Sequence, residues 1–171
     1  MRLKIKRIEP GDIGAVRSMA MGFMHEFESK LEYPTLDESE VDNRMFDILG
    51  NIGNPECVHL IAYDGKKPAG FFVGWVGDKP YSRPRRVGVA QELYVAPEKR
   101  AGLVGLSLME EAARIAIERG AQGLECIGTY NGTDQRWAKF GFKPYVTYGH
   151  MNTDDFMALV TRFTKGRPVA A

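Results

Sequence analysis

The segment that most restricts the possible folds of this chain is residues 87–120, where a strand, a short turn and a helix are expected in succession. Residues 87–96 are apolar and β-prone, and Pro97 ends the strand because proline cannot donate to a sheet ladder. The helix expected over 102–120 is predicted by apolar residues at helical spacing: Leu108, Ala112 and Ile115. A strand that leads into a long amphipathic helix is typical of folds in which helices pack on a sheet.

The rest of the chain predicts further elements on both sides of this segment. Apolar and basic residues alternate over 3–8, which predicts a strand. Two apolar segments flank a connection over 64–68 and predict an antiparallel hairpin. Asp37 followed by Glu40 has the pattern of a helix N-terminus. The remaining expected elements are helices over 13–27, 41–48 and 133–140 and strands over 58–62, 69–76, 123–129 and 142–151, while 154–163 fits either a strand or a short helix.

These elements together predict the class of the fold. We expect an α/β (α+β) fold with a mixed, mostly antiparallel sheet of about six to seven strands, flanked by about four helices. No shift in composition divides the chain, so we expect a single domain over 1–164. The last residues, 165–171, are expected to form a flexible tail.

Charge and cysteine content exclude several classes of protein. The 23 basic and 22 acidic side chains give a net charge of +1, which provides no field toward nucleic acid or an anionic membrane. The longest apolar run, 71–77, is far shorter than the ~20 residues of a membrane-spanning helix. Cys57 and Cys126 form no disulfide framework or zinc motif, and no histidine pair has metal-ligand spacing. We therefore expect a cytoplasmic protein with free thiols and no metal.

The turn before the 102–120 helix has the features of a phosphate site. A helix N-terminus presents unpaired N–H groups and a partial positive charge. Gly102 and Gly105 allow a ligand to approach the backbone, and Arg100 adds a positive charge at the rim. The same residues also fit a strand-to-helix turn that binds nothing, so this segment alone leaves both interpretations open.

The order of the elements and two short motifs resemble the GCN5-related N-acetyltransferase (GNAT) family over nearly the whole chain. In that family a Gln/Arg-x-x-Gly-x-Gly/Ala turn holds the pyrophosphate of acetyl-CoA, and Arg100 and Gly105 fit its register. Asn131 and the segment 137–142 resemble the family's Asn, short helix and Tyr-x-x-x-Gly-Phe sequence. The resemblance implies acetyl-CoA as co-substrate, with these binding residues: Tyr94, Val95, Arg100, Ala101, Gly102, Leu103, Val104, Gly105, Leu106, Asn131 and Trp137.

The sequence departs from the family pattern at two positions. Leu103 takes the place of the first motif glycine, and Trp137 that of a tyrosine often used in catalysis. Because an indole N–H cannot act as a general acid, that role falls to water or to another tyrosine, with Tyr145 as a candidate beside Tyr130 and Tyr148. The departures also support an alternative, a non-catalytic acyl-CoA-binding or interaction domain of the same fold.

The resemblance implies transfer of an acetyl group to a primary amine of a small molecule or protein by direct attack. A base must take a proton from the amine, and the candidates are Glu92 and Glu125, two carboxylates within otherwise apolar strands. Either carboxylate also fits a solvated strand face or an ion pair. A backbone N–H near Val95 is the implied oxyanion donor. The acceptor, and the choice between monomer and homodimer, stay open.

A third interpretation is nucleic-acid binding by the basic segment 79–86, in which Tyr81 lies among lysine and arginine residues. Basic residues beside an aromatic ring can grip phosphate and stack on a base. One such loop at a net charge of +1 is weak support, so we expect no nucleic-acid partner. The segment can equally flank an acceptor site.

Overall fold

The computed structural model describes residues 3–28, 37–79, 86–100 and 103–126. The chain separates into two compact units, Met1–Ile127 and Gly128–Ala171, and all described residues belong to the first. The elements expected over 133–163 and the tail lie outside the described residues. The single domain over 1–164 stays a prediction.

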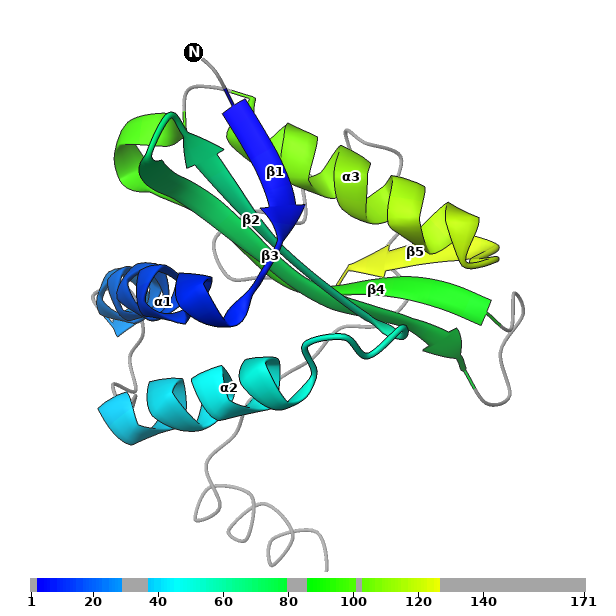
Figure 1. Ribbon diagram of the computed structural model, residues 1–171, viewed down its shortest axis with the longest axis horizontal. Helices are drawn as coiled ribbons and strands as arrows, with labels where there is room; N and C mark the ends of the chain where they lie inside the picture. Colours follow the sequence, from blue (N-terminus) through cyan, green and yellow to red (C-terminus); the bar gives the residue numbers. More distant parts are fainter. Residues whose placement is uncertain (1–2, 29–36, 80–85, 101–102, 127–171) are drawn as a thin grey trace, which may run out of the picture. The chain divides into compact units, whose positions relative to one another are not determined.

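The first unit contains a mixed, mostly antiparallel sheet (Figure 1). Its strands are β1 (Leu3–Arg7), β2 (Cys57–Asp64), β3 (Lys67–Asp78), β4 (Arg86–Val95) and β5 (Gly123–Cys126). They lie in the order β1-β2-β3-β4-β5, and neighbours are antiparallel as far as β4. β5 pairs in parallel with β4 along Val87 to Ala90, which requires the helical crossover between them. The α/β class expected from the sequence is therefore confirmed.

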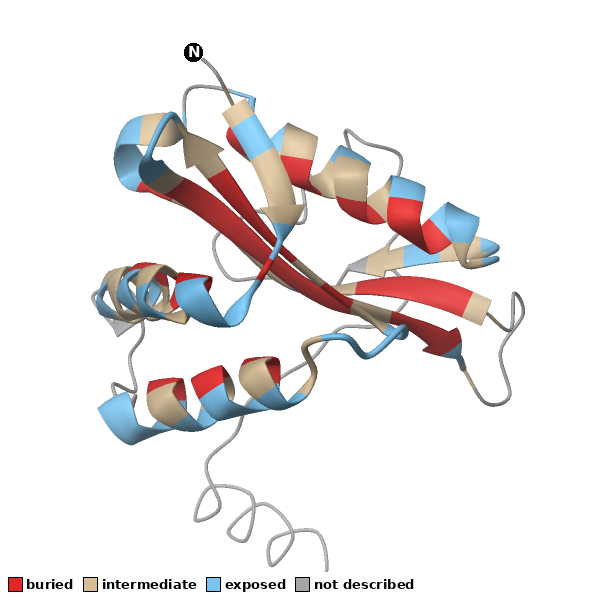
Figure 2. Ribbon diagram, viewed as in Figure 1, coloured by how far each residue is buried: buried red, intermediate tan, exposed pale blue. Residues whose placement is uncertain are grey.

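Helices cover both faces of this sheet (Figure 1). They are η1 (Pro10–Asp12), α1 (Ile13–Glu28), α2 (Glu38–Gly50), η2 (Pro97–Lys99) and α3 (Val104–Glu118), of which η1 and η2 are 3-10 turns. α1 and α2 share one core with Phe71 and Val73 of β3, whereas α3 shares another with Phe72 and Val76. Figure 2 shows the buried residues gathered on the strands and on the helix sides turned toward them. The sheet thus separates two cores.

The β2–β3 hairpin is tighter than the sequence suggests. Its turn is Gly65-Lys66, and Lys67 and Pro68, expected in the connection, are the first residues of β3. That part of the prediction is wrong, because Gly65 adopts a φ of 64°, the left-handed conformation that allows a short hairpin turn. Pro68 lies next to a register irregularity of the β2–β3 ladder, where a missing N–H costs least.

A β-bulge in β4 decides which way Glu92 points. Val73 of β3 pairs with Glu92. The next residue, Gly74, pairs with Ala90, so Gln91 is an extra residue in β4. Because side chains alternate between the faces of a strand, one inserted residue moves the following side chains to the other face. The bulge therefore places Glu92 on the face of α1 and α2 instead of the face of α3.

Gly74 is required beside this bulge because the backbone of β4 approaches it closely. A Cβ atom at Gly74 would lie 2.3 Å from the carbonyl oxygen of Val89, which is far inside van der Waals contact. The glycine and the bulge therefore belong to one local arrangement, and together they fix the orientation of Glu92.

Candidate functional site

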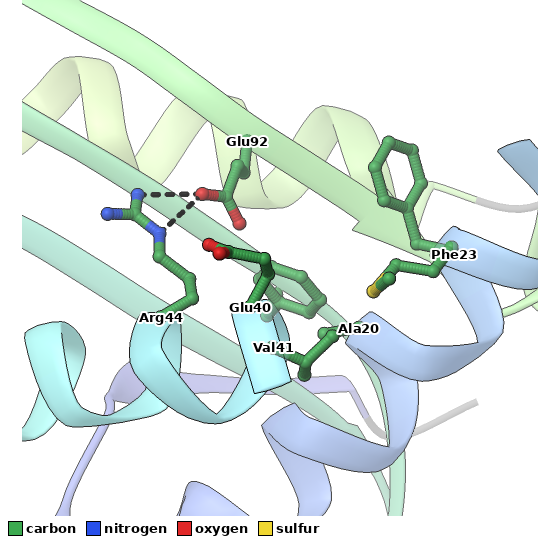
Figure 3. A pocket seen from close by; sticks show the side chains of 8 residues that line it. Ala20, Phe23, Glu40, Val41, Arg44 and Glu92 are labelled. Atoms are coloured by element: carbon green, nitrogen blue, oxygen red, sulfur yellow. Dashed lines mark hydrogen bonds and ion pairs between the residues drawn. The ribbon is translucent and has the colours of Figure 1, made fainter. Parts of the chain in front are cut away.

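Glu92 is held by an arginine from α2. Nε and Nη2 of Arg44 lie 2.7 and 2.6 Å from Oε1 of Glu92 (Figure 3). The Arg44 and Glu92 side chains are 32% and 34% exposed, so the pair is partly shielded from water. Both contacts end on Oε1. Within the described residues no donor is bound to Oε2, which is left to accept a proton or a hydrogen bond.

A pocket of about 120 Å³ lies beside this pair, between α1, α2 and the strands β3 and β4 (Figure 3). Its apolar wall consists of Ala20, Phe23, Met24, Val41 and Phe71. Its charged side consists of Glu40, Arg44 and Glu92. An apolar surface beside carboxylates suits a molecule that joins an apolar body to a positively charged end.

Glu125, the second candidate base, lies on the same face of the sheet but has a different partner. It pairs with Val89 in the β4–β5 ladder, and the alternation of side chains puts both on the face of α1 and α2. Nζ of Lys79 lies 3.0 and 2.8 Å from its two carboxylate oxygens. Since one ammonium group occupies both oxygens, Glu125 is less available than Glu92 as a proton acceptor.

His59 belongs to the same row of side chains as Glu92. His59 of β2 lies opposite Val73, which in turn lies opposite Glu92. Burial, and then the positive charge of Arg44, lowers the pKa of His59 to about 4. Nδ1 of this histidine is buried, and among the described residues no group is hydrogen-bonded to it. The imidazole is therefore neutral at pH 7.

We expect His59 to make the folded protein sensitive to acid. Its pKa falls from 6.5 to about 4 on folding, so the unfolded chain takes up the proton first and stability decreases as the pH drops through this range. His59→Phe keeps a ring that cannot be protonated. This variant should lose less of its melting temperature between pH 7 and pH 5 than the unaltered protein. Thermal melts at both pH values check this, and equal losses would contradict it.

Tyr94 is a core residue. It is only 6% exposed, and its ring centre lies 6.0 Å from that of Phe23 and 5.9 Å from that of Phe71. Burial raises the pKa of its hydroxyl group. The side chain of Tyr94 therefore supports α1, and the contact with acetyl-CoA expected for this residue stays a prediction.

The N-terminus of α3 follows β4 and η2. α3 begins at Val104, and the preceding residue, Leu103, has no side-chain group that caps the first turn. Leu103 and Leu106 are 64% and 49% exposed. A Cβ atom at Gly105 would lie 3.2 Å from Cγ2 of Val95, so strand and helix approach each other closely there. Unpaired N–H groups at such a helix start suit a phosphate.

Arg100 is bound to α1. Its Nη1 and Nη2 lie 2.6 and 2.5 Å from the carboxylate oxygens of Glu26, and its Nε donates to the carbonyl oxygen of Val95 at 2.9 Å. The guanidinium carbon also lies 5.5 Å from the centre of the Tyr94 ring. The arginine thus ties α1 to the end of β4. A contact with phosphate requires it to share or exchange the Glu26 carboxylate.

Several expected site residues lie outside the described residues: Ala101, Gly102, Asn131, Trp137 and Tyr145. Their roles stay predictions. Within the part of the chain that the structure describes, no group of three or more His, Cys, Asp or Glu side chains is arranged to hold a metal ion. None of the described helices is long and apolar enough to cross a membrane.

The family to which the chain belongs follows from its sequence and agrees with this arrangement. A model described as the acetyltransferase (GNAT) family matches residues 21–142, which is more than half of the chain. The chain therefore belongs to the GNAT family of acetyltransferases. A search among curated proteins finds no match.

Solved structures share the fold at low sequence identity. A GCN5-related N-acetyltransferase from Ralstonia eutropha JMP134 is 18% identical with a TM-score of 0.69, and 88% of this chain and 99% of that chain are covered. A predicted acetyltransferase with acetyl-CoA from Clostridium acetobutylicum is 17% identical with a TM-score of 0.70, covering 90% and 98%. An aminoglycoside N-acetyltransferase in complex with CoA is 13% identical with a TM-score of 0.68, covering 89% and 95%. These likenesses confirm the fold that the sequence predicts.

Sequence reasoning missed the residues that surround Glu92. Arg44 lies 48 positions before it, and no local pattern connects the two. One signal was present, because Glu40 and Arg44 are four residues apart and so share a side of α2, next to the buried stripe of Val41 and Met45. Two charged groups beside a buried helix stripe indicate a polar site facing the sheet.

Proposed function

We propose that this chain is an acetyl-CoA-dependent N-acetyltransferase whose acceptor is a primary amine of a small molecule or a protein. The observation that carries the proposal is the bulge in β4, which turns Glu92 into the pocket between α1, α2 and the sheet. The same strand is followed by η2 and then by the N-terminus of α3, which Leu103 does not cap with a side-chain group. One strand thus joins a candidate base to a candidate phosphate site.

The proposed site for acetyl-CoA follows β4 and the start of α3. The pyrophosphate accepts hydrogen bonds from the first N–H groups of α3, at the positive end of the helix dipole. The pantetheine is proposed to pair with the backbone of β4. The residues proposed for this site are Tyr94 and Val95 through their backbone, and Arg100, Ala101, Gly102, Leu103, Val104, Gly105, Leu106, Asn131 and Trp137.

Acetyl transfer in this proposal is a direct attack. Oε2 of Glu92 takes a proton from the amine, directly or through one water, and the neutral nitrogen attacks the thioester carbon. A backbone N–H near Val95 donates to the carbonyl oxygen as negative charge develops. The C–N bond forms and the C–S bond breaks. The CoA thiolate takes a proton from Tyr145 or water, and the second proton of the nitrogen, lost as the amide forms, replaces it there. Glu125 is the alternative base, although Lys79 occupies both of its oxygens.

A non-catalytic acyl-CoA-binding or interaction domain is the second candidate. Leu103 favours it, because a leucine that is 64% exposed stands directly before α3, where the family motif has a glycine. Both candidates bind acetyl-CoA, but only the enzyme transfers the acetyl group to an amine. Either proposal includes three expectations from the sequence. The protein is cytoplasmic, it is a monomer or a homodimer, and it binds neither a metal nor nucleic acid.

Acetyl-CoA should raise the melting temperature of the protein. A ligand at ~100 times its Kd adds about 2.7 kcal/mol to the free energy of unfolding. For a chain of this size, that corresponds to roughly 5–10 °C. Melting curves with acetyl-CoA, and with ADP as an anion control, measure this shift. If acetyl-CoA raises the melting temperature and amines then cause thiol release, the protein is an enzyme. If the melting temperature rises but no amine causes thiol release, the non-catalytic domain is supported. An unchanged melting temperature at millimolar acetyl-CoA contradicts both proposals.

A further inference from the structure

We propose that the pocket between α1, α2 and the sheet selects a cationic amine with an apolar body and rejects amines that carry a carboxylate or phosphate near the nitrogen. This inference rests on the proposed acetyl transfer and names the class of acceptor. It rests on the apolar wall of the pocket, on the carboxylates beside that wall and on the ion pair between Arg44 and Glu92.

One side of the pocket is apolar. Phe23 and Met24 come from α1, and Phe71 comes from the β3 strand beneath them. Burial of a hydrocarbon body against such side chains contributes about 25 cal/mol for each Å² removed from water. A polyhydroxylated acceptor would lose its hydrogen bonds with water at this wall without gaining partners there. The wall therefore favours alkyl or aryl carbons next to the reacting nitrogen.

The charged side of the pocket has a net negative charge, because the Arg44–Glu92 ion pair is neutral as a whole and Glu40 adds one negative charge. Arg44 binds Glu92, so its positive charge is already used. Glu40 also lines the pocket, and among the described residues no cation is bonded to its carboxylate. Figure 3 shows Glu40 and Glu92 on the side of Arg44, with Phe23 on the other side. One negative charge is thus left to attract an ammonium group, and a second anion is repelled.

The size of the pocket limits how much of the acceptor it takes. Its volume of about 120 Å³ is smaller than the ~300–1,000 Å³ of whole small-molecule sites. It therefore holds the amine end and the carbons next to it. Oε2 of Glu92 removes one proton from the ammonium there, and the resulting nitrogen lone pair forms the new C–N bond. As the C–S bond breaks, the nitrogen loses its second proton, which balances the proton taken up by the CoA thiolate.

The test compares acceptors that differ in one feature. 2-Phenylethylamine and L-phenylalanine have the same ring and amine and differ by the carboxylate beside the nitrogen, while ethanolamine lacks the apolar body. With acetyl-CoA saturating, thiol release should give a kcat/KM for 2-phenylethylamine that is about 100-fold above L-phenylalanine and about tenfold above ethanolamine. Glucosamine and a lysine-containing peptide complete the panel.

Glu40→Gln tests the charge directly. It should raise the KM for 2-phenylethylamine about tenfold, leave the KM for acetyl-CoA unchanged and narrow the preference over L-phenylalanine. Glu38→Gln is the matched control, because Glu38 lies on the same helix, is exposed and does not line the pocket. A purely structural role of Glu40 would not change the ratio between the two acceptors.

The outcomes separate this inference from the proposal on which it rests. Preference for L-phenylalanine, glucosamine or ethanolamine, or an unchanged acceptor ratio in Glu40→Gln, overturns the inference and leaves an N-acetyltransferase. Acetylation of the lysine peptide agrees with the inference, because its reacting nitrogen follows an alkyl chain and has no anion beside it. Absence of thiol release with every amine, in a protein that acetyl-CoA stabilises, overturns both the acceptor class and the catalytic function.

Discussion

Glu92→Gln lowers kcat by about 100-fold or more, because loss of a general base typically costs ~10²–10⁴ in rate. The amide keeps an oxygen that can accept from Arg44, whose Nε lies 2.7 Å from Oε1 in the unaltered protein. The pair that places the side chain is therefore largely preserved, while the proton acceptor is lost. Steady-state thiol release measures kcat, and the melting shift with acetyl-CoA should stay close to that of the unaltered protein.

Glu125→Gln is the matched control for this result. Glu125 lies on the same face of the sheet, but Lys79 binds both of its oxygens. If Glu92 is the base, as proposed, the kcat of Glu125→Gln should change by less than about fivefold. If Glu92→Gln turns over normally at every pH while Glu125→Gln is slow, the assignment of the base is wrong.

Gly105→Asp should weaken acetyl-CoA binding by about 100-fold, because a carboxylate then stands in the first turn of α3, at the proposed site of the pyrophosphate. The position tolerates little bulk, since a Cβ atom there lies 3.2 Å from Cγ2 of Val95. Calorimetric titration with acetyl-CoA measures the Kd of the variant, and circular dichroism shows whether it is folded.

Gly105→Ala separates crowding from charge. It adds the same Cβ atom against Val95 but no carboxylate. The alanine variant should bind acetyl-CoA within about fivefold of the unaltered protein, whereas the aspartate variant should not. Equal affinities in a folded aspartate variant would mean that the phosphate lies elsewhere.

Local patterns predicted much of this fold. The periodicity that indicates a helix after Pro97 corresponds to α3, and the β-prone segments on either side of residues 64–68 correspond to β2 and β3. Asp37 was expected to begin a helix, and its Oδ1 does accept the N–H of Ser39 at 2.9 Å. Each of these features is set by residues a few positions apart, so a single sequence carries the information.

The site depends on contacts that no local pattern carries. The bulge at Gln91 cannot be read from alternation, yet it decides the face on which Glu92 lies. The partners Arg44 and Glu26 are 48 and 74 positions from Glu92 and Arg100, so only the folded sheet brings them together. Arg100, which the sequence suggests as a phosphate ligand, therefore binds the carboxylate of Glu26 in this structure.

Formation of product tests the central claim most directly. Purified protein is mixed with acetyl-CoA and primary amines that include 2-phenylethylamine, glucosamine and a lysine peptide, and the products are identified by mass spectrometry beside thiol release. We expect an N-acetylated amine, one thiol released for each amide formed, and formation of both slowed by about 100-fold or more in Glu92→Gln. A protein that binds acetyl-CoA but forms no amide and releases no thiol with any of these amines would contradict it.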